Sequence, residues 1–320
     1  MPSTLHAKLS ALERGFKTSA LEKIADPLLQ KRQIDLWLKR DDLLHPVISG
    51  NKWRKLKFIL NHALELGSDT LISMGGFYSN HLHALAYAGK ELGLKTIGLV
   101  RGEPPQVLSP TLEDCRNWGM ELRFVSRSDY RRLRQYRESF DLPGISPGQY
   151  WLPEGGAQAL ALQGVAELVE EIGIPFDVLC LPCGTGTTLA GCIAALDGAK
   201  TAIGFAALKN ADFLASDVER LLTKSSLTPA LSRRERGKFR CQWQINQNYH
   251  CGGFAKTTPE LLEFIRIFEL TQQIPLEPVY TGKMLYGLFD MIAKGEFAPG
   301  QRIIAVHTGG LQGRRGFNAI

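Results

Sequence analysis

The stretch DVLCLPCGTGTTLAG (Asp177–Gly191) decides the fold, because a buried strand, a glycine-rich turn and a helix start follow one another in it. The apolar run Asp177–Cys183 predicts a strand, and Thr187–Leu196 predicts the helix after it. Glycines let backbone N–H groups turn toward an anion, hydroxyls add donors, and the helix start adds its positive end. The turn therefore indicates an anion site, although an ordinary strand-to-helix turn also contains glycine. The candidate anion ligands are Gly184, Thr185, Gly186, Thr187 and Thr188.

Strands and helices alternate on both sides of this stretch. The expected strands are Thr70–Gly76, Thr96–Gly102, Glu121–Ser126 and Arg302–Gly310, and the expected helices are His81–Leu92, Leu108–Trp118, Gln158–Ile172 and Met284–Lys294. Such alternation predicts an α/β fold of parallel sheets covered on both faces. We expect two three-layer α/β/α domains with a cleft between them. Residues 1–52 with 154–320 would form the larger, and residues 53–153 the smaller.

Composition bounds the class of protein. At 320 residues and 44% hydrophobic, the chain can bury a large core, and its net charge is +6. The excess is partly local, in basic clusters over residues 131–137 and 233–240, each of which contains a single aromatic residue, Tyr136 or Phe239. We interpret these clusters as solvated surface and expect no nucleic-acid partner. Because there is no signal-type segment and no membrane-length apolar run, we expect a cytoplasmic protein.

The six cysteines are scattered, which is typical of a reduced protein rather than a disulfide framework. Cys180 and Cys183 form a CxxC, but on a strand this spacing points the two side chains to opposite faces. We therefore interpret them as structural thiols and expect no metal site.

One region departs from the pattern. Lys224–Arg240, KSSLTPALSRRERGKFR, is rich in basic residues and has little apolar periodicity. Such a segment cannot bury enough surface to offset its ordering entropy, so we expect a flexible insertion at 224–240. The alternative is a basic docking arm.

The segment ISGNKWRKLKFI (Ile48–Ile59) places Lys52 in the first turn of an expected helix, directly after a Ser-Gly turn. The positive helix end disfavours a second positive charge there, which would lower the pKa of the amine. A neutral amine is the form that Schiff-base chemistry requires. Lys52 is therefore the candidate nucleophile.

A third segment, GGFYSNH (Gly75–His81), follows the strand at Thr70–Gly76. Ligands of open α/β sheets bind at the carboxyl ends of strands, so Ser79 and Asn80 are candidate ligand contacts. The alternative is that one of them caps the helix that follows. We interpret His81 and His83 as packing histidines, because no third residue completes a metal site.

Together with VYTGK (Val279–Lys283), these segments indicate a pyridoxal phosphate site. A nucleotide-binding site is less well supported, because neither a Walker lysine nor a GxGxxG is present. In motif, order and spacing, the four segments resemble the family of 1-aminocyclopropane-1-carboxylate deaminases and D-cysteine desulfhydrases. These are pyridoxal-phosphate enzymes of fold type II, the tryptophan synthase β fold. The resemblance runs from about Leu36 to the C-terminus, interrupted at the basic segment.

The resemblance implies a role for each candidate residue. Lys52 would bind the cofactor as a Schiff base and later move the Cα proton, and the glycine–threonine turn would hold the phosphate with Lys55 near it. Asn80 would contact the ring hydroxyl of the cofactor. Ser79 would touch the substrate, and Tyr280 would lie beside the reacting amino acid.

Two positions favour the desulfhydrase branch. By the resemblance, Thr281 matches the position that faces the pyridine nitrogen of the cofactor. This position looks like a glutamate in the deaminase branch and a threonine in the desulfhydrase branch. A carboxylate there favours a protonated ring and a deep electron sink, as ring opening needs, whereas threonine suffices for β-elimination of a good leaving group. Phe254 stands where the deaminases carry a tyrosine. One departure concerns the residues after His81: the family usually continues SNH with an Arg-Gln pair, whereas this chain continues with Leu82, His83 and Ala84.

The resemblance thus implies a lyase that converts a small amino acid, D-cysteine for preference, to pyruvate, sulfide and ammonia. One alternative is 1-aminocyclopropane-1-carboxylate deaminase, and another is a catalytically idle protein that binds pyridoxal phosphate or an amino acid. The family also implies a homodimer.

Overall fold

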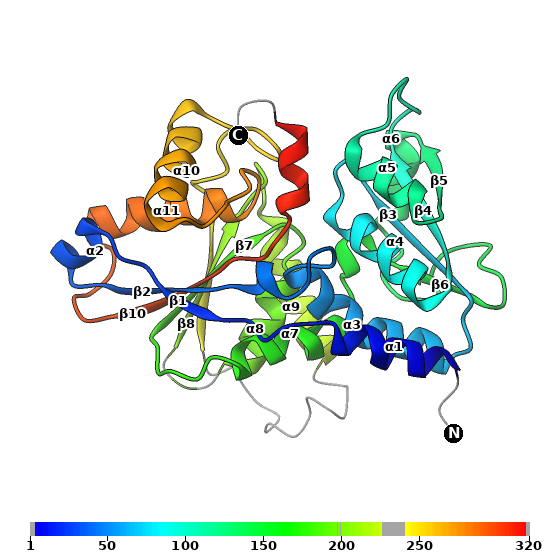
Figure 1. Cartoon of the computed structure of the whole chain (residues 1–320), viewed down its shortest axis with the longest axis horizontal. Coiled ribbons are helices and arrows are strands. Elements are labelled where there is room, and N and C mark those ends of the chain that lie inside the picture. Colours follow the sequence, from blue (N-terminus) through cyan, green and yellow to red (C-terminus); the bar gives the residue numbers. More distant parts are fainter. Residues whose placement is uncertain (1–3, 197, 199, 226–240, 318–320) are drawn as a thin grey trace.

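The computed structural model describes residues 4–196, 198, 200–225 and 241–317. Within them the strands form two sheets, which lie in two lobes of an elongated chain (Figure 1). The larger sheet has the order β1-β2-β10-β7-β8-β9, with β1 (Leu21–Lys23), β2 (Asp35–Lys39), β7 (Val178–Cys183), β8 (Thr201–Ala206), β9 (Gln242–Asn246) and β10 (Arg302–Val306). The smaller has the order β5-β4-β3-β6, with β3 (Thr70–Gly75), β4 (Lys95–Arg101), β5 (Met120–Val125) and β6 (Gln149–Leu152).

Helices surround both sheets. The α-helices are α1 (Thr4–Arg14), α2 (Pro27–Arg32), α3 (Asn51–Glu65), α4 (Asn80–Leu92), α5 (Pro110–Asn117), α6 (Arg127–Leu133), α7 (Leu160–Glu170), α8 (Thr187–Ala195), α9 (Phe213–Ser225), α10 (Pro259–Gln272) and α11 (Thr281–Lys294). Short 3₁₀ turns are η1 (Asp41–Leu43), η2 (Glu154–Gly156) and η3 (Leu311–Gly316).

The larger sheet has a helical layer on each face, as expected. Its neighbouring strands are parallel except β1, which runs antiparallel to β2. On β7, Leu179 and Leu181 pack with α7, α8 and α9, whereas Val178 and Cys180 pack with α2, α10 and α11. Cys183 belongs to the first of these faces, so the two CxxC thiols are buried, free and on opposite faces, as the spacing predicted.

The smaller sheet is parallel throughout. One face packs against α1, α3, α4 and α5. The other face, which includes Ile72 and Trp151, is covered by Tyr130 of α6 and by apolar residues of the loop that follows. The third layer of the smaller sheet is therefore one short helix and a loop.

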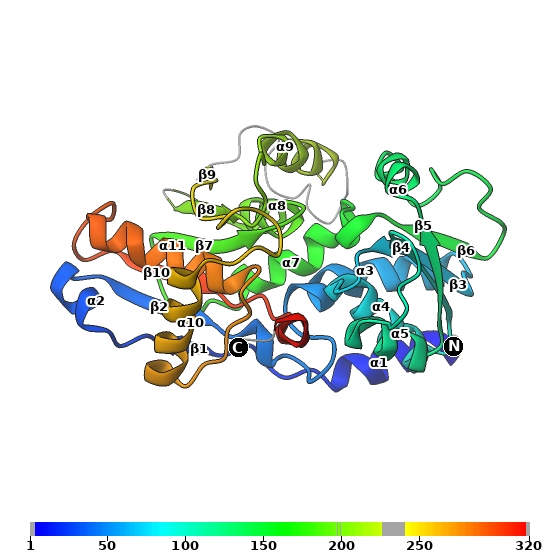
Figure 2. The same cartoon turned by 90° about the horizontal axis from the view of Figure 1, so that it is seen from above.

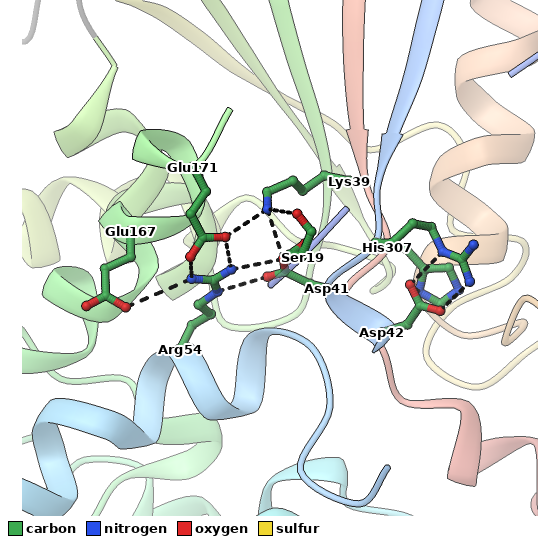
Figure 3. A network of polar contacts seen from close by, with 9 residues as sticks. Ser19, Lys39, Asp41, Asp42, Arg54, Glu167, Glu171 and His307 are labelled. Atoms are coloured by element: carbon green, nitrogen blue, oxygen red, sulfur yellow. Dashed lines mark hydrogen bonds and ion pairs between the residues drawn. The ribbon is translucent and has the colours of Figure 1, made fainter. Parts of the chain in front are cut away.

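Helix α3 joins the two halves, because it packs on α7 and also contributes to the core of the smaller sheet (Figure 2). Its Arg54 is buried among acids: Nε donates to Asp41 at 3.1 Å and Nη2 to Glu171 at 2.6 Å. Lys39 of β2 donates to the same Glu171 at 2.8 Å (Figure 3). This network fastens α3 to the larger sheet. The expected domain boundary between residues 52 and 53 falls inside α3, and the division of the chain at that point stays a prediction.

The expected helices and strands are present, with most ends within two residues of the prediction. Two differ more. The strand β10 stops at Val306, because residues 307–310 turn away with positive φ at Gly309 and Gly310. Helix α11 begins three residues earlier than expected, at Thr281.

The basic segment expected to be an insertion is described only at its start. Lys224 and Ser225 were expected to begin a loop, which is wrong: both lie in the last turn of α9, where Ser225 is buried and Lys224 pairs with Glu138. The rest of that prediction, residues 226–240, lies outside the described residues. In the part of the chain that the structure describes, no helix is long and apolar enough to cross a membrane.

Candidate active site

The lysine and the glycine–threonine turn lie next to each other. Lys52 is in the first turn of α3, where its Nζ donates to Asn51 Oδ1 at 2.7 Å. Asn51 Nδ2 in turn donates to Thr188 Oγ1 at 2.9 Å. Two hydrogen bonds and one amide group therefore separate the Lys52 amine from the Thr188 hydroxyl, which limits their distance to roughly 8 Å. A single small cofactor can reach both.

A backbone contact between distant segments places Lys52. Gly50 precedes α3 with φ +64°, and a Cβ at this position would lie 1.9 Å from Thr308 O. Gly309 also has positive φ, and its Cβ would lie 2.6 Å from Ser49 Oγ. Only glycine accommodates both the conformation and the close approach. The start of α3 is thereby held against the loop that follows β10.

The environment of Lys52 favours the neutral amine. Burial lowers its pKa to about 8, against the opposing charge of Glu277. Lys55, one turn later, is buried with a single long hydrogen bond to Gly155 O at 3.3 Å. Burial and the nearby Lys52 hold the pKa of Lys55 well below its usual value. A neutral fraction of Lys52 at neutral pH is what a carbonyl-binding amine needs.

The glycine–threonine turn is built around close contacts. Gly186 caps α8 with φ +71°, and a Cβ there would lie 2.8 Å from Val218 Cγ2. Thr185 and Thr187 share a hydrogen bond of 2.9 Å between their hydroxyls. The first N–H groups of α8 have no intrahelical acceptor, as at any helix start. The turn can therefore present amide and hydroxyl donors to an anion.

His81 lies beside the two lysines, although we expected a packing histidine. It is 2% exposed, and Lys52 and Lys55 add to burial in lowering its pKa to about 3. Ser73 Oγ donates its hydrogen to Leu152 O at 2.7 Å, so at its 2.9 Å contact with His81 Nε2 it must accept. His81 is thus the neutral tautomer with hydrogen on Nε2, and its buried Nδ1 has no hydrogen-bond partner.

These features fit a phosphate-bearing aldehyde. Lys52 and Lys55 are amines close together, and burial lowers the pKa of both; Glu277 opposes this at Lys52, whereas the charge of Lys52 lowers the pKa of Lys55 further. A buried cation without an acid is costly unless an anion joins it. Lys55 and the glycine–threonine turn would hold the phosphate of pyridoxal phosphate, and Lys52 its aldehyde.

Asn80 and Ser79 lie at the start of α4. Ser79 Oγ accepts from Leu82 N at 3.2 Å, so the capping alternative is confirmed for Ser79, whose hydroxyl hydrogen can still be donated elsewhere. Asn80 Oδ1 accepts from Gln312 of η3. A Cβ on Gly310 would lie 2.6 Å from Asn80 Nδ2, so Asn80 touches the loop that holds Gly50.

Tyr280 and Thr281 lie at the start of α11. A Cβ on Gly184 would lie 3.1 Å from the Tyr280 ring, so the tyrosine packs directly against the glycine–threonine turn. Its ring is edge-on to Phe254, with centroids 6.0 Å apart, and burial raises the pKa of its hydroxyl. Thr281 is fully buried, and its Oγ1 lies 3.5 Å from Thr308 Oγ1.

The structure thus brings the predicted site residues to one place, and it adds residues that the sequence argument missed. Asn51, Glu277 and Thr308 each contact a predicted residue directly. Thr308 carried a usable signal, because Thr-Gly-Gly after a parallel strand resembles the Gly-Gly that drew attention to Asn80. His83, by contrast, packs edge-on against Trp118, with ring centroids 4.7 Å apart, and pairs with Asp114 at 3.2 Å.

Comparison with known proteins supports the same chemistry. The family model described as "Pyridoxal-phosphate dependent enzyme" matches residues 21–309. A Pyrococcus horikoshii protein, provisionally named a 1-aminocyclopropane-1-carboxylate deaminase, is 31% identical over 97% of this chain and 96% of its own. The mitochondrial bifunctional D-cysteine desulfhydrase/1-aminocyclopropane-1-carboxylate deaminase of Arabidopsis thaliana is 31% identical over 87% of this chain and 73% of its own.

A solved structure extends the comparison to three dimensions. The crystal structure of an ACC deaminase homologue superposes with a TM-score of 0.80 at 30% identity, covering 98% of this chain and 97% of that one. The expected fold class and cofactor are thereby confirmed. The chain belongs to the pyridoxal-phosphate dependent enzymes, as a lyase of the 1-aminocyclopropane-1-carboxylate deaminase family.

Proposed function

We propose that the chain is a D-cysteine desulfhydrase, which converts D-cysteine and water to pyruvate, hydrogen sulfide and ammonia. The observation that carries this proposal is that the side chain of Thr281 offers a hydroxyl, and not a carboxylate, at the position expected to face the ring nitrogen. Its hydroxyl lies beside that of Thr308, at 3.5 Å. The buried acid nearest in sequence, Glu277, is engaged by backbone N–H groups and so is not available to protonate a ring nitrogen. A neutral partner suffices for elimination of a thiolate.

When bound, pyridoxal phosphate supplies an aldehyde that condenses with amines and a ring that stabilises negative charge at Cα. Lys52 Nζ would hold that aldehyde and, when displaced by the substrate amine, accept the proton from Cα. Its lowered pKa makes the neutral base available near neutral pH. Asn51, which holds Nζ at 2.7 Å, would keep the amine pointed toward the turn at Thr188.

The remaining residues would orient the reactants. Tyr280, packed on Gly184, would cover one side of the reacting carbon and exclude water from it. The Ser79 hydroxyl, with its hydrogen still available, would donate to the substrate carboxylate. Asn80, held by Gln312, would contact the ring hydroxyl of the cofactor.

The second candidate is the deaminase that opens 1-aminocyclopropane-1-carboxylate. The names of most of the relatives favour it, and the plant relative is named for both reactions. Phe254 argues against it, because its ring, edge-on to Tyr280, has no hydroxyl to move a proton during ring opening.

The test measures sulfide and the 2-oxo acid formed, pyruvate or 2-oxobutanoate, after the purified protein, loaded with pyridoxal phosphate, is given D-cysteine, L-cysteine or 1-aminocyclopropane-1-carboxylate. We expect sulfide and pyruvate from D-cysteine, and none with Lys52→Ala. Ammonia and the four-carbon acid 2-oxobutanoate from the cyclopropane, with no sulfide from D-cysteine, would replace our proposal with the deaminase. A yellow protein that turns over none of the three would support the idle binding protein.

Thr281→Glu tests the carrying observation, since it offers the ring nitrogen a carboxylate. We expect it to raise cyclopropane turnover relative to D-cysteine turnover. We also propose a homodimer, which light scattering of the purified chain can test.

A further inference from the structure

The side chain of one acidic residue, Glu277, caps the N-terminus of α11. The Glu277 carboxylate, 2% exposed, accepts backbone N–H groups from Val279 at 2.7 Å, from Tyr280 at 2.9 Å and from Thr281. The backbone oxygen of Glu277 accepts the next N–H, that of Gly282, at 2.9 Å. Residue 278 is proline and has no N–H. Every backbone donor from residue 278 to residue 282 therefore ends on Glu277.

This arrangement fixes two candidate site residues by their backbones. Tyr280 is the N-cap of α11, with φ −122° and ψ −78°, and Thr281 is its first residue. A helix start would otherwise leave these donors to water or to a ligand. Because Glu277 engages them, α11 differs from α8, whose first turn keeps donors for an anion. The backbone that carries the side chains of Tyr280 and Thr281 is therefore fixed by the Glu277 carboxylate, and not by water or a ligand.

Glu277 also carries a negative charge among several buried amines. Thr281, which donates to this carboxylate, lies beside Thr308, and Thr308 O accepts from the N–H of Asn51, the neighbour of Lys52, at 3.3 Å. At this short remove the charge of Glu277 raises the pKa of Lys52 against the effect of burial. It acts likewise on Lys283 of α11, which is 2% exposed and donates to Gly253 O at 2.7 Å. The other groups that act on this neighbourhood are the amine of Lys55, the imidazole of His81 and three groups that can become negative. These three are Cys183, which acts on Lys55, Cys251, which acts on Lys283, and Glu154 of η2, which acts on Tyr280.

We propose that Glu277 is a positioning residue of the active site, which holds Tyr280 and Thr281 by their backbone N–H groups and supplies the buried counter-charge of Lys52. The proposal rests on the proposed function only in taking those three residues as site residues. Burial raises the pKa of Glu277 to about 7, so its charge changes close to the range in which Lys52 titrates. A helix cap without this second role would leave the Lys52 amine unaffected.

The experiment reads the protonation of Lys52 directly. The full chain, freed of cofactor, is labelled by reductive methylation at a series of pH values, and the methylation of Lys52 is followed by peptide mass spectrometry. We expect a midpoint near the Lys52 pKa of about 8 in the unchanged chain. Glu277→Gln should lower the midpoint by on the order of one unit, which raises the neutral amine at pH 7 roughly fivefold, from about a tenth to about a half of the molecules.

The matched control is Glu113→Gln, which removes an exposed carboxylate from the first turn of α5 and should leave the midpoint unchanged. An unchanged midpoint in folded Glu277→Gln protein would overturn the proposal. No amino-acid substrate is used, so this failure is distinct from a failure of the D-cysteine assay.

A measurement on the unchanged chain covers the case in which Glu277→Gln does not fold. In protein labelled with ¹⁵N-tyrosine, the Tyr280 amide signal, assigned by its loss in Tyr280→Phe, should shift with pH around a midpoint near the Glu277 pKa of about 7. A Tyr280 amide that does not respond to pH in that range would overturn the proposal as well.

Discussion

Gly50 is the position at which a single methyl group should disturb the site most. It adopts φ +64° and ψ −149°, a region of backbone space nearly confined to glycine. In Gly50→Ala the new Cβ would lie 1.9 Å from Thr308 O and 2.7 Å from Gly309 N. Both neighbours are backbone atoms, so no side chain can turn aside to make room. One of the two chain segments has to move by more than about 1 Å to reach ordinary contact.

The size of the effect follows from two terms. The backbone conformation costs about 1–3 kcal/mol for a residue with a Cβ. Displacing packed backbone adds about 1–3 kcal/mol, by analogy with overfilled cores. Gly67→Ala is the matched control, since Gly67 has φ +69° and nothing within 4 Å of the added carbon. The control should cost only about 1–2 kcal/mol, so Gly50→Ala should lose roughly 1–4 kcal/mol more.

Urea unfolding of both variants measures the free energy of unfolding, and titration with pyridoxal phosphate measures the affinity of the site for the cofactor. Thr308 contacts Thr281, and Lys52 follows Gly50 by two residues, so movement at this contact changes both ends of the site. We expect affinity for the cofactor to fall at least about tenfold in Gly50→Ala and to be unchanged in Gly67→Ala. Equal losses of stability in the two variants, with cofactor affinity retained, would refute the reasoning.

Three other outcomes can be checked. Arg54→Met leaves the buried carboxylate of Asp41 without its closest cation and should lower the free energy of unfolding by about 3–5 kcal/mol in a urea titration. Arg123→Met, in an exposed pair, should cost less than about 1 kcal/mol, and similar losses for the two would contradict us. His81→Gln retains an N–H donor for Ser73, whereas His81→Asn should lose it, at about 1–3 kcal/mol and a lower thermal midpoint. The rate at which the protein captures pyridoxal phosphate should rise with pH and level off above about 8, since only neutral Lys52 reacts; stopped-flow absorbance with a flat profile would argue otherwise.

The fold was predictable where local patterns decide it. The strands β3, β4 and β7 are apolar runs bounded by glycine, proline or polar residues, and their observed ends lie within one residue of the expected ones. Strand β9 was not expected, because it lies at an edge of the larger sheet and four of its five residues, in QWQIN, are polar or aromatic. An edge strand needs no apolar face toward both helical layers, so its sequence carries a weak signal.

The residue types of the site were predictable, but the causes of their behaviour were not. From the sequence alone, the positive end of α3 was the expected cause of a lowered pKa at Lys52. In the structure the largest cause is burial, and Glu277 opposes it from a segment 225 residues later. Likewise Gly50 was recognised as a turn residue, whereas its necessity comes from Thr308 O on a distant loop.

Burial and opposing charge are properties of the assembled chain, because they depend on which segments meet. A motif can therefore name the amine that reacts, but how much of it is neutral at a given pH depends on contacts that the motif does not contain. In this protein those contacts are the Gly50–Thr308 approach and the carboxylate of Glu277. Relatives that keep the lysine motif but change either contact should therefore differ in the pH at which they capture the cofactor. Measuring that pH for chains with and without an acid at the position of Glu277 would separate the contribution of the motif from that of its surroundings.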